Sequence, residues 1–242
     1  KNERDLQLAS AVQHGLIAPV IKTPEWDTEV FFRAASSVSG DFYDFYRLDK
    51  KTLGVALMDV SGHGVSSALI TMLAKPIFVQ SFANNPQNTL REIIADINDQ
   101  MKDTLSSIDN YLTGVIMRLH PDAIYLINAA HPAPFFKSAR RGKIAQVEAT
   151  GMFLGVEGMG EEYKTARINV RSGDLILLYT DALVESKNAE GEQFGMDRVE
   201  EILAMRHWSP KELIDQLMTS LFEFTGSSNL DDDLTIIVSQ RQ

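Results

Sequence analysis

The sequence predicts an α+β fold built from antiparallel β-sheets covered by helices. The predicted strands follow one another mostly as hairpins, and the predicted helices are bunched between sets of strands. This arrangement favours antiparallel pairing over the regular strand–helix alternation of a doubly wound fold. The number of strands suits two sheets rather than one.

The chain is expected to open with a helix over residues 1–17, ended by Pro19, because its apolar residues recur at helical spacing. A linker or signalling helix (1–20) and a main domain (21–242) are expected. Because the sequence starts at Lys1 without methionine, we also expect an upstream sensory or receiver domain. The apolar face of the helix is expected to pack on the main domain or on a second copy of the chain.

Three short strands in quick succession are expected next, followed by two longer helical segments. Residues 65–83 carry apolar residues three or four apart, which predicts a helix. Pro76 is expected to kink or interrupt this helix, because proline lacks an N–H and crowds the preceding turn. A second helix is expected over residues 88–106. The strands before these helices are expected over residues 28–35, 42–48 and 53–59.

The next predicted element is a hairpin over residues 115–128, with the turn signal His120-Pro121-Asp122. Ser209 and Pro210 suit the cap and first turn of the last helix. The expected helices here cover residues 195–205 and 209–224. The further expected strands cover residues 134–138, 144–147, 163–170, 174–180 and 234–240.

Composition narrows the class of protein. With 242 residues, 44% of them hydrophobic, the chain can form one large domain or two small ones with a full core. A net charge of −10 argues against nucleic acid or an anionic membrane as the main partner. Without cysteine, disulfides and cysteine-bound zinc are excluded. No membrane-length apolar run or signal-peptide pattern occurs, so a soluble, cytoplasmic protein is expected.

Acidic residues lie where apolar strands begin or end. Asp59 ends LGVALMD, Asp181 ends DLILLYTD, and DDD at 231–233 directly precedes LTIIVS. Asp41 and Asp44 lie at the start of the strand in VSGDFYDFY. Converging carboxylates raise one another's pKa unless cations lie between them. Oxygen ligands without His or Cys suit Mg²⁺ or Mn²⁺, so the pattern predicts a metal site at the strand ends.

Each acidic site taken alone is also typical of a structural role, because Asp is common in turns and helix caps. The DDDL segment is compatible with a solvated loop, and Asp44 is compatible with a surface residue. LGVALMD is also typical of a Walker B strand, but no GxxxxGK[ST] motif accompanies it. No EF-hand loop occurs either.

Five motifs occur in register across about residues 5–240: VSGDFYDFY, MDVSGHG, INAAHPAP, YTDALVE and DDDLT. Together they resemble the bacterial metal-dependent serine/threonine phosphatases of the PPM (protein phosphatase 2C) class. Within that class they resemble the branch of the sporulation stage II E phosphatase and the activators of the general stress sigma factor. The resemblance implies a sandwich of two antiparallel sheets with helices on both outer faces. It also implies two ions, Mn²⁺ or Mg²⁺, at one end.

The resemblance assigns ligands residue by residue. Asp59 would bridge the two ions, and the backbone carbonyl of Val60 would add a ligand. Asp181 and Asp232 would hold one ion, and Asp41 would reach the other largely through water. The family pattern Asp-Asp-x-Thr favours Asp232 over its two acidic neighbours. Asp59, Asp181 and Asp232 are thus the expected catalytic carboxylates, supporting in-line attack on phosphorus by a water activated between two metals.

Supporting roles are expected for neighbouring residues. Gly62 and Gly64 would let the backbone turn tightly beside the ions. His63 suits either support of this turn or proton transfer to the leaving group. His131 suits holding a loop, and Glu185 suits supporting the ligands.

Three positions depart from the family pattern. Ala182 and Ala130 stand where glycines are usual, and the pair at 39–40 is Ser-Gly rather than Gly-Gly. If the family glycine at 182 has positive φ, the Ala182 methyl group costs on the order of 1 kcal/mol and shifts Asp181. Ala182→Gly is then expected to raise turnover.

Two functions of different classes are compatible with these residues. One is a protein phosphatase that hydrolyses phosphoserine or phosphothreonine on a regulatory protein, an anti-sigma-factor antagonist by the resemblance alone. The other is an adaptor of the same fold that binds a regulatory protein with little turnover. The retained acidic ligands favour the enzyme, whereas the two alanines leave room for the adaptor. Metal-dependent hydrolysis of a phosphoester distinguishes the two.

Overall fold

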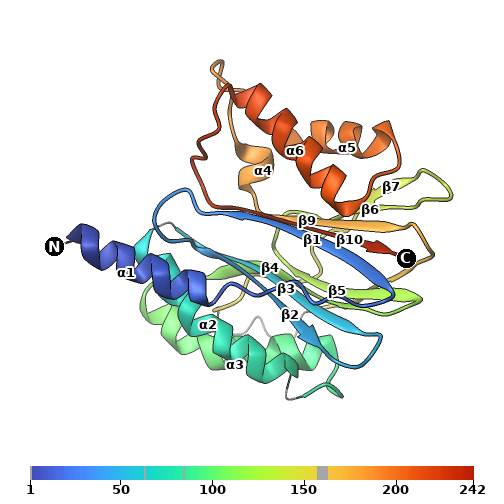
Figure 1. The fold of residues 1–242 in the computed structure, drawn as a ribbon. Coiled ribbons are helices and arrows are strands. Elements are labelled where there is room, and N and C mark those ends of the chain that lie inside the picture. The colour runs from blue at the N-terminus through green and yellow to red at the C-terminus, as the bar shows by residue number, and fades with distance from the viewer. Residues whose placement is uncertain (1, 63, 84, 157–162) are drawn as a thin grey trace.

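The fold was analysed in a computed structural model that describes residues 2–62, 64–83, 85–156 and 163–242. Two five-stranded sheets face each other, with helices on both outer sides (Figure 1). One sheet has the order β1-β10-β9-β6-β7 and the other β2-β3-β4-β5-β8. Every pairing between these strands is antiparallel. The predicted fold class is confirmed.

The strands lie close to their expected positions, with shifts of a few residues at the ends. The first begins at Trp26 rather than at 28, and the hairpin begins at Leu112 rather than at 115. The strands are β1 (Trp26–Arg33), β2 (Asp41–Arg47), β3 (Leu53–Val60), β4 (Leu112–Leu119), β5 (Ala123–Ala129), β6 (Phe135–Lys137), β7 (Ile144–Gln146), β8 (Ala166–Asn169), β9 (Leu175–Tyr179) and β10 (Leu234–Arg241).

The helices also follow the expected order, with one short addition after Asp181. Ser209 caps the last helix, accepting a hydrogen bond from the Glu212 N–H with Pro210 in the first turn, as predicted. The helices are α1 (Asn2–Gly15), α2 (Val65–Ala83), α3 (Leu90–Ser107), α4 (Ala182–Glu185), α5 (Gly195–Met205) and α6 (Pro210–Thr225).

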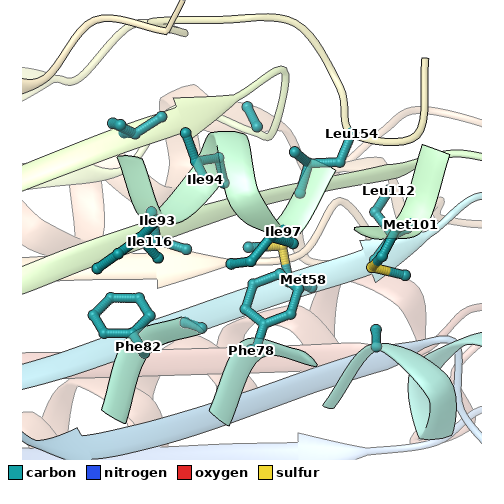
Figure 2. Close-up of a cluster of buried hydrophobic side chains, with 14 of the residues drawn as sticks. Met58, Phe78, Phe82, Ile93, Ile94, Ile97, Met101, Leu112, Ile116 and Leu154 are labelled. Carbon is teal, nitrogen blue, oxygen red and sulfur yellow. The ribbon is translucent and has the colours of Figure 1, made fainter. Parts of the chain in front are cut away.

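Three apolar layers hold the sandwich together. The inner layer lies between the sheets and includes Leu57, Val115 and Ile237. A second layer joins α5 and α6 to the sheet that contains β9 and β10. The third joins α2 and α3 to the other sheet, where Met58 lies beside Phe78 from α2 and Ile116 lies beside Ile93 from α3 (Figure 2). Because β3 and β9 each carry apolar residues on both faces, both strands are rigidly held.

Helix α2 continues through Pro76, so of the two predicted effects of this proline, a kink or an interruption, the interruption is wrong. Phe78 and Phe82, which follow the proline, are fully buried and anchor the helix on the sheet. By length and composition α2 could span a membrane, so the expectation that no membrane-length apolar run occurs is wrong, although 44% of that segment is buried in this domain. Part of its apolar character is explained by the core that it completes, whereas Leu69 and Leu73 are exposed.

Helix α1 lies beside α2 at the edge of the sandwich (Figure 1). The Gln13 side chain donates a hydrogen bond to Thr71 Oγ1 at 3.1 Å, and Lys75 Nζ donates to the Leu16 carbonyl. The outer side of α1 nevertheless leaves Leu8 and Val12 more than half exposed. The helix is therefore attached to the domain by polar contacts, while an apolar stripe faces solvent.

Candidate functional site

The turn after β3 brings the backbone to the mouth of a cavity. Gly62 and Gly64 have φ of 85° and 84°, a left-handed region that glycine adopts without a steric cost. Helix α2 then begins at Val65. The tight turn predicted for MDVSGHG is present, and His63 lies outside the described residues. Val60 is held at this turn by an N–H hydrogen bond to the Gly40 carbonyl at 3.1 Å.

A cavity of about 550 Å³ lies at this end of the sandwich. Four carboxylates line it: Asp59 from the end of β3, Asp181 and Glu185 around α4, and Asp232 before β10. The backbone around Val60 also lines the cavity, as does the part of the β5–β6 connection that contains His131. The structure therefore brings together the three predicted catalytic carboxylates, although they lie far apart in sequence.

The electrostatics of the cavity reflect this convergence. Burial, followed by repulsion from Asp181 and Asp232, raises the pKa of Asp59 to about 8. Burial and repulsion from Asp232 raise the pKa of Asp181 to about 6. The described lining includes no Lys or Arg. The cavity is therefore a site of concentrated negative charge that a cation would stabilise.

Asp41 lies behind these carboxylates rather than in the cavity lining. It pairs with Asp59 across β2 and β3 and is almost fully buried. Its Oδ2 accepts hydrogen bonds from Thr180 Oγ1 at 2.9 Å and from Thr235 Oγ1 at 2.7 Å. Burial and the charge of Asp59 raise the pKa of Asp41 well above its usual range. The two threonines join the two sheets at the site, a role that sequence reasoning missed.

The three consecutive acidic residues have different environments. Asp231 and Asp232 are exposed, and Asp232 lines the cavity. Asp233 is buried and turned away: its two oxygens accept hydrogen bonds from the N–H groups of Ala35, at 2.8 Å, and Gly40, at 2.6 Å. Asp232 therefore occupies the position that could hold a metal, whereas Asp233 fixes the loop before β2.

Asp44 belongs to a different environment, and the surface position considered for it is wrong. It is buried on β2 and pairs with Lys75 of α2 at 3.4 Å. Burial raises its pKa and Lys75 lowers it. Asp44 therefore attaches α2 to the sheet and takes no part in the cavity.

His131 is a buried structural connector at the cavity wall. Its Nε2 lies 2.9 Å from the Tyr179 carbonyl oxygen. Because a carbonyl oxygen can only accept a hydrogen bond, Nε2 carries the proton. Nδ1 then accepts the hydrogen bond from Thr113 Oγ1 at 3.0 Å. Burial lowers the pKa of His131 to about 4, so the ring is neutral at neutral pH. It joins β4, β9 and the loop after β5, as predicted for a loop-holding residue.

The strained alanine is at 130, and the expectation for residue 182 is wrong. Ala182 is the first residue of α4, buried against the α5–α6 layer, and does not have positive φ. Ala130 has φ of 53°, where a Cβ clashes with the following carbonyl. Its N–H donates to the Gly151 carbonyl at 3.1 Å, which holds the turn closed. A gain in turnover from Ala182→Gly therefore has no basis in this backbone.

The donor set fits a hard divalent cation. Among the described residues, no three Asp, Glu or His side chains are already closed around one point. Carboxylates that repel one another are expected to lie apart, and Mg²⁺ keeps several waters as ligands. Carboxylate and backbone oxygens that line an open cavity therefore suit Mg²⁺ or Mn²⁺ better than an ion that requires a closed protein cage.

Two phosphatases of Bacillus subtilis (strain 168) are similar in sequence. "Phosphoserine phosphatase RsbP" is 26% identical over 188 residues, which covers 76% of this chain and 46% of RsbP. "Phosphoserine phosphatase RsbU" is 25% identical over 241 residues, which covers 98% of this chain and 70% of RsbU. The chain thus spans less than half of RsbP.

The fold is shared with the SiaA-PP2C domain of Pseudomonas aeruginosa, with a TM-score of 0.82 and 19% sequence identity. That match covers 99% of this chain and 96% of the SiaA domain. The family model described as "Stage II sporulation protein E (SpoIIE)" matches residues 49–242, which include β3, the cavity turn and β10. The chain therefore belongs to the SpoIIE family and has a PP2C-type fold.

Proposed function

We propose that this chain is a metal-dependent protein phosphatase that hydrolyses phosphoserine or phosphothreonine on a regulatory protein. The observation that carries the proposal is the charge of the cavity. Four carboxylates converge there, the described lining has no Lys or Arg, and His131 is neutral. A phosphate monoester, itself close to a dianion at neutral pH, would be repelled unless cations were bound between it and the carboxylates.

Asp59, Asp181, Asp232 and the Val60 carbonyl would hold Mn²⁺ or Mg²⁺, with Asp41 contributing largely through water. Two such ions lower the pKa of water and neutralise phosphoryl charge in hydrolysis. The protein positions these ligands. Thr180 and Thr235 fix the Asp41 carboxylate with two hydrogen bonds, and Asp233 holds the loop that leads to it.

The names of the relatives support the proposed substrate class. RsbU and RsbP are named phosphoserine phosphatases, and the motifs resemble the branch that regulates the general stress sigma factor. The proposed substrate is therefore a phosphorylated anti-sigma-factor antagonist in the cytoplasm. An upstream sensory or receiver domain is proposed to control the activity.

A second copy of the chain is the proposed partner for the exposed stripe of α1. Leu8 and Val12 of α1 and Leu16, which directly follows this helix, recur every four residues and are exposed, as are Leu69 and Leu73 of the adjacent α2. Burying these side chains between two copies would stabilise a dimer. Light scattering should show a dimer that Val12→Glu dissociates. A monomer over a wide concentration range would exclude this pairing.

A phosphatase assay tests the enzyme proposal against the adaptor alternative. A phosphoserine peptide is incubated with the chain and Mn²⁺ or Mg²⁺, and released phosphate is measured. Asp59→Asn should reduce the rate by several orders of magnitude, while Asp231→Asn, the exposed acidic neighbour of the site, should leave it unchanged. Equal rates in the wild type and Asp59→Asn would exclude the mechanism. No hydrolysis by the wild type, together with binding of the regulatory protein, would favour the adaptor.

A further inference from the structure

A second cavity, of about 420 Å³, lies between the two edge strands β7 and β8. We call it the hairpin pocket, because the turns after β6 and β8 supply most of its wall. It is at the other end of β9 from the candidate active site, since Asp174 precedes this strand and Asp181 follows it. Its described lining is Phe136, Ser138, Arg140, Arg141, Lys143, Ala145, Asn169, Arg171 and Asp174.

The two turns are fixed to each other by one buried carboxylate. Asp174 Oδ1 accepts a hydrogen bond from the Ala139 N–H, and Oδ2 accepts one from the Arg171 N–H, both at 2.9 Å. The turns also touch, because a Cβ built on Gly173 would lie 2.9 Å from the Ala139 Cβ. The cationic side chains of the two turns are therefore carried on a fixed backbone.

The charge of the hairpin pocket is opposite to that of the molecule. Four cationic side chains line it against the single carboxylate of Asp174, an excess of three positive charges (four minus one) in a chain of net charge −10. Within the described parts of the chain, the ion pairs that form lie elsewhere, so none of these cations is neutralised by an Asp or Glu. All four are exposed and available to a ligand.

We propose that the hairpin pocket binds a small anion with two or more phosphate groups. Guanidinium groups bind phosphate oxygens in pairs of hydrogen bonds. One phosphate group carries about −1.5 to −2 charges at neutral pH, so two or more are needed to balance the pocket. The volume lies within the range of small-molecule sites rather than that of a flat protein interface. Half-buried Phe136 and the Asn169 amide add an apolar surface and a hydrogen-bonding group.

Titration calorimetry with inorganic tripolyphosphate and with ATP tests the proposal on the whole chain without added metal. Tripolyphosphate should bind, and more weakly as salt rises. Arg141→Ala/Arg171→Ala should weaken binding by at least about tenfold, because each Arg contributes charged hydrogen bonds. Arg4→Ala, an exposed arginine on α1, is the matched control and should bind as the wild type does. Equal affinity for the two ligands would indicate that the phosphate chain alone is recognised, and tighter ATP would indicate added nucleoside contacts.

Asp59→Asn separates this pocket from the candidate active site and should retain binding. Loss of binding in Asp59→Asn with full binding in the double arginine variant would place the anion at the carboxylate cavity and overturn the proposal. Absence of binding by the wild type would overturn it as well. So would binding of a Glu-rich peptide without binding of tripolyphosphate, since this would indicate an acidic protein surface as the ligand. None of these results depends on phosphatase activity.

Discussion

The side-chain amide of Gln13 holds the backbone of Ser39 through both of its polar atoms. Gln13 Oε1 accepts the Ser39 N–H at 2.8 Å, and Nε2 donates to the Ser39 carbonyl at 2.6 Å. Ser39 Oγ in turn accepts the N–H of Asp41 at 3.0 Å. Helix α1 is thereby connected to the first residue of β2 and to the carboxylate that faces Asp59 across the sheet.

Replacing Gln13 should therefore affect both stability and the site. Gln13→Ala removes two hydrogen bonds to a buried backbone segment and should lower the free energy of unfolding by about 1–3 kcal/mol. If the proposed activity holds, the Mn²⁺ concentration needed for half-maximal hydrolysis should rise as well. Gln7→Ala on the exposed side of α1 is the control for loss of a glutamine from the helix. Urea denaturation of both variants measures the effect, and identical midpoints would contradict it.

Substitution by glycine should change the stability in opposite directions at Ala130 and Ala182, the two positions where the family pattern has glycine. Ala130→Gly relieves positive φ and should stabilise the chain by up to about 1 kcal/mol. Ala182→Gly removes a buried methyl group from a helix and should destabilise it by about 1–2 kcal/mol. Thermal melts of the two variants show directly whether each substitution raises or lowers the melting temperature. A higher melting temperature for Ala182→Gly than for Ala130→Gly would contradict this assignment of strain.

Asp233 should be sensitive to substitution for a structural reason. Asp233→Asn replaces one acceptor oxygen by an NH₂ group that would face the N–H of Ala35 or Gly40, so one buried donor loses its partner. Such a loss costs about 1–3 kcal/mol. Asp231→Asn, which changes the charge equally at an exposed position, should cost little. Equal stability of the two variants in urea would show that the loop is held by other contacts.

His131 should make the fold sensitive to mild acid. Its folded pKa of about 4 lies below the ordinary value of 6.5, so the unfolded chain binds a proton first as the pH falls. The contribution of the neutral ring is complete above pH 6.5 and declines toward pH 4, by about 3 kcal/mol. His131→Gln should remove this dependence, whereas His207→Gln, at an exposed position, should keep it. Urea midpoints at pH 7 and pH 4.5 measure the difference, and parallel losses in wild type and His131→Gln would contradict it.

Features that a local sequence pattern specifies could be predicted, whereas features that depend on contacts between distant segments could not. The position of Asp59 at the end of β3 is predictable because a run of apolar residues identifies a buried strand locally. The burial of Asp44 is not predictable in this way, because Asp44 pairs with Lys75 from a separate helix. The contacts of Thr180 and Thr235 with Asp41 require both sheets to be in place. The positive φ of Ala130 could be anticipated from the family glycine at this position, whereas its hydrogen bond to Gly151 is a contact between distant segments that the motif does not specify.

The repulsion among the cavity carboxylates should be measurable as a stability that falls with rising pH. Asp59 has a pKa of about 8 in the folded chain and an ordinary value of 3.8, so the unfolded chain releases its proton first. Without metal, the contribution of Asp59 to stability should therefore decline as the pH rises from about 4 to 8, opposite in sign to the contribution of His131. Asp59→Asn has no proton to lose and should be more stable than the wild type at pH 8, by on the order of 2–4 kcal/mol, with the gain shrinking toward pH 5.

Added Mn²⁺ should reverse this order, because an ion that binds only the folded chain stabilises it by mass action. The wild type should gain melting temperature with Mn²⁺ at pH 8, and Asp59→Asn should lose most of that gain. Asp231→Asn should behave as the wild type in both conditions, since its carboxylate lies outside the cavity lining. Melts in a chelator and in Mn²⁺, at pH 5 and pH 8, separate the two effects. A metal-free Asp59→Asn that is less stable than the wild type at pH 8 would show that Asp59 is not held under repulsion, and an equal Mn²⁺ gain in both would show that it does not hold the ion.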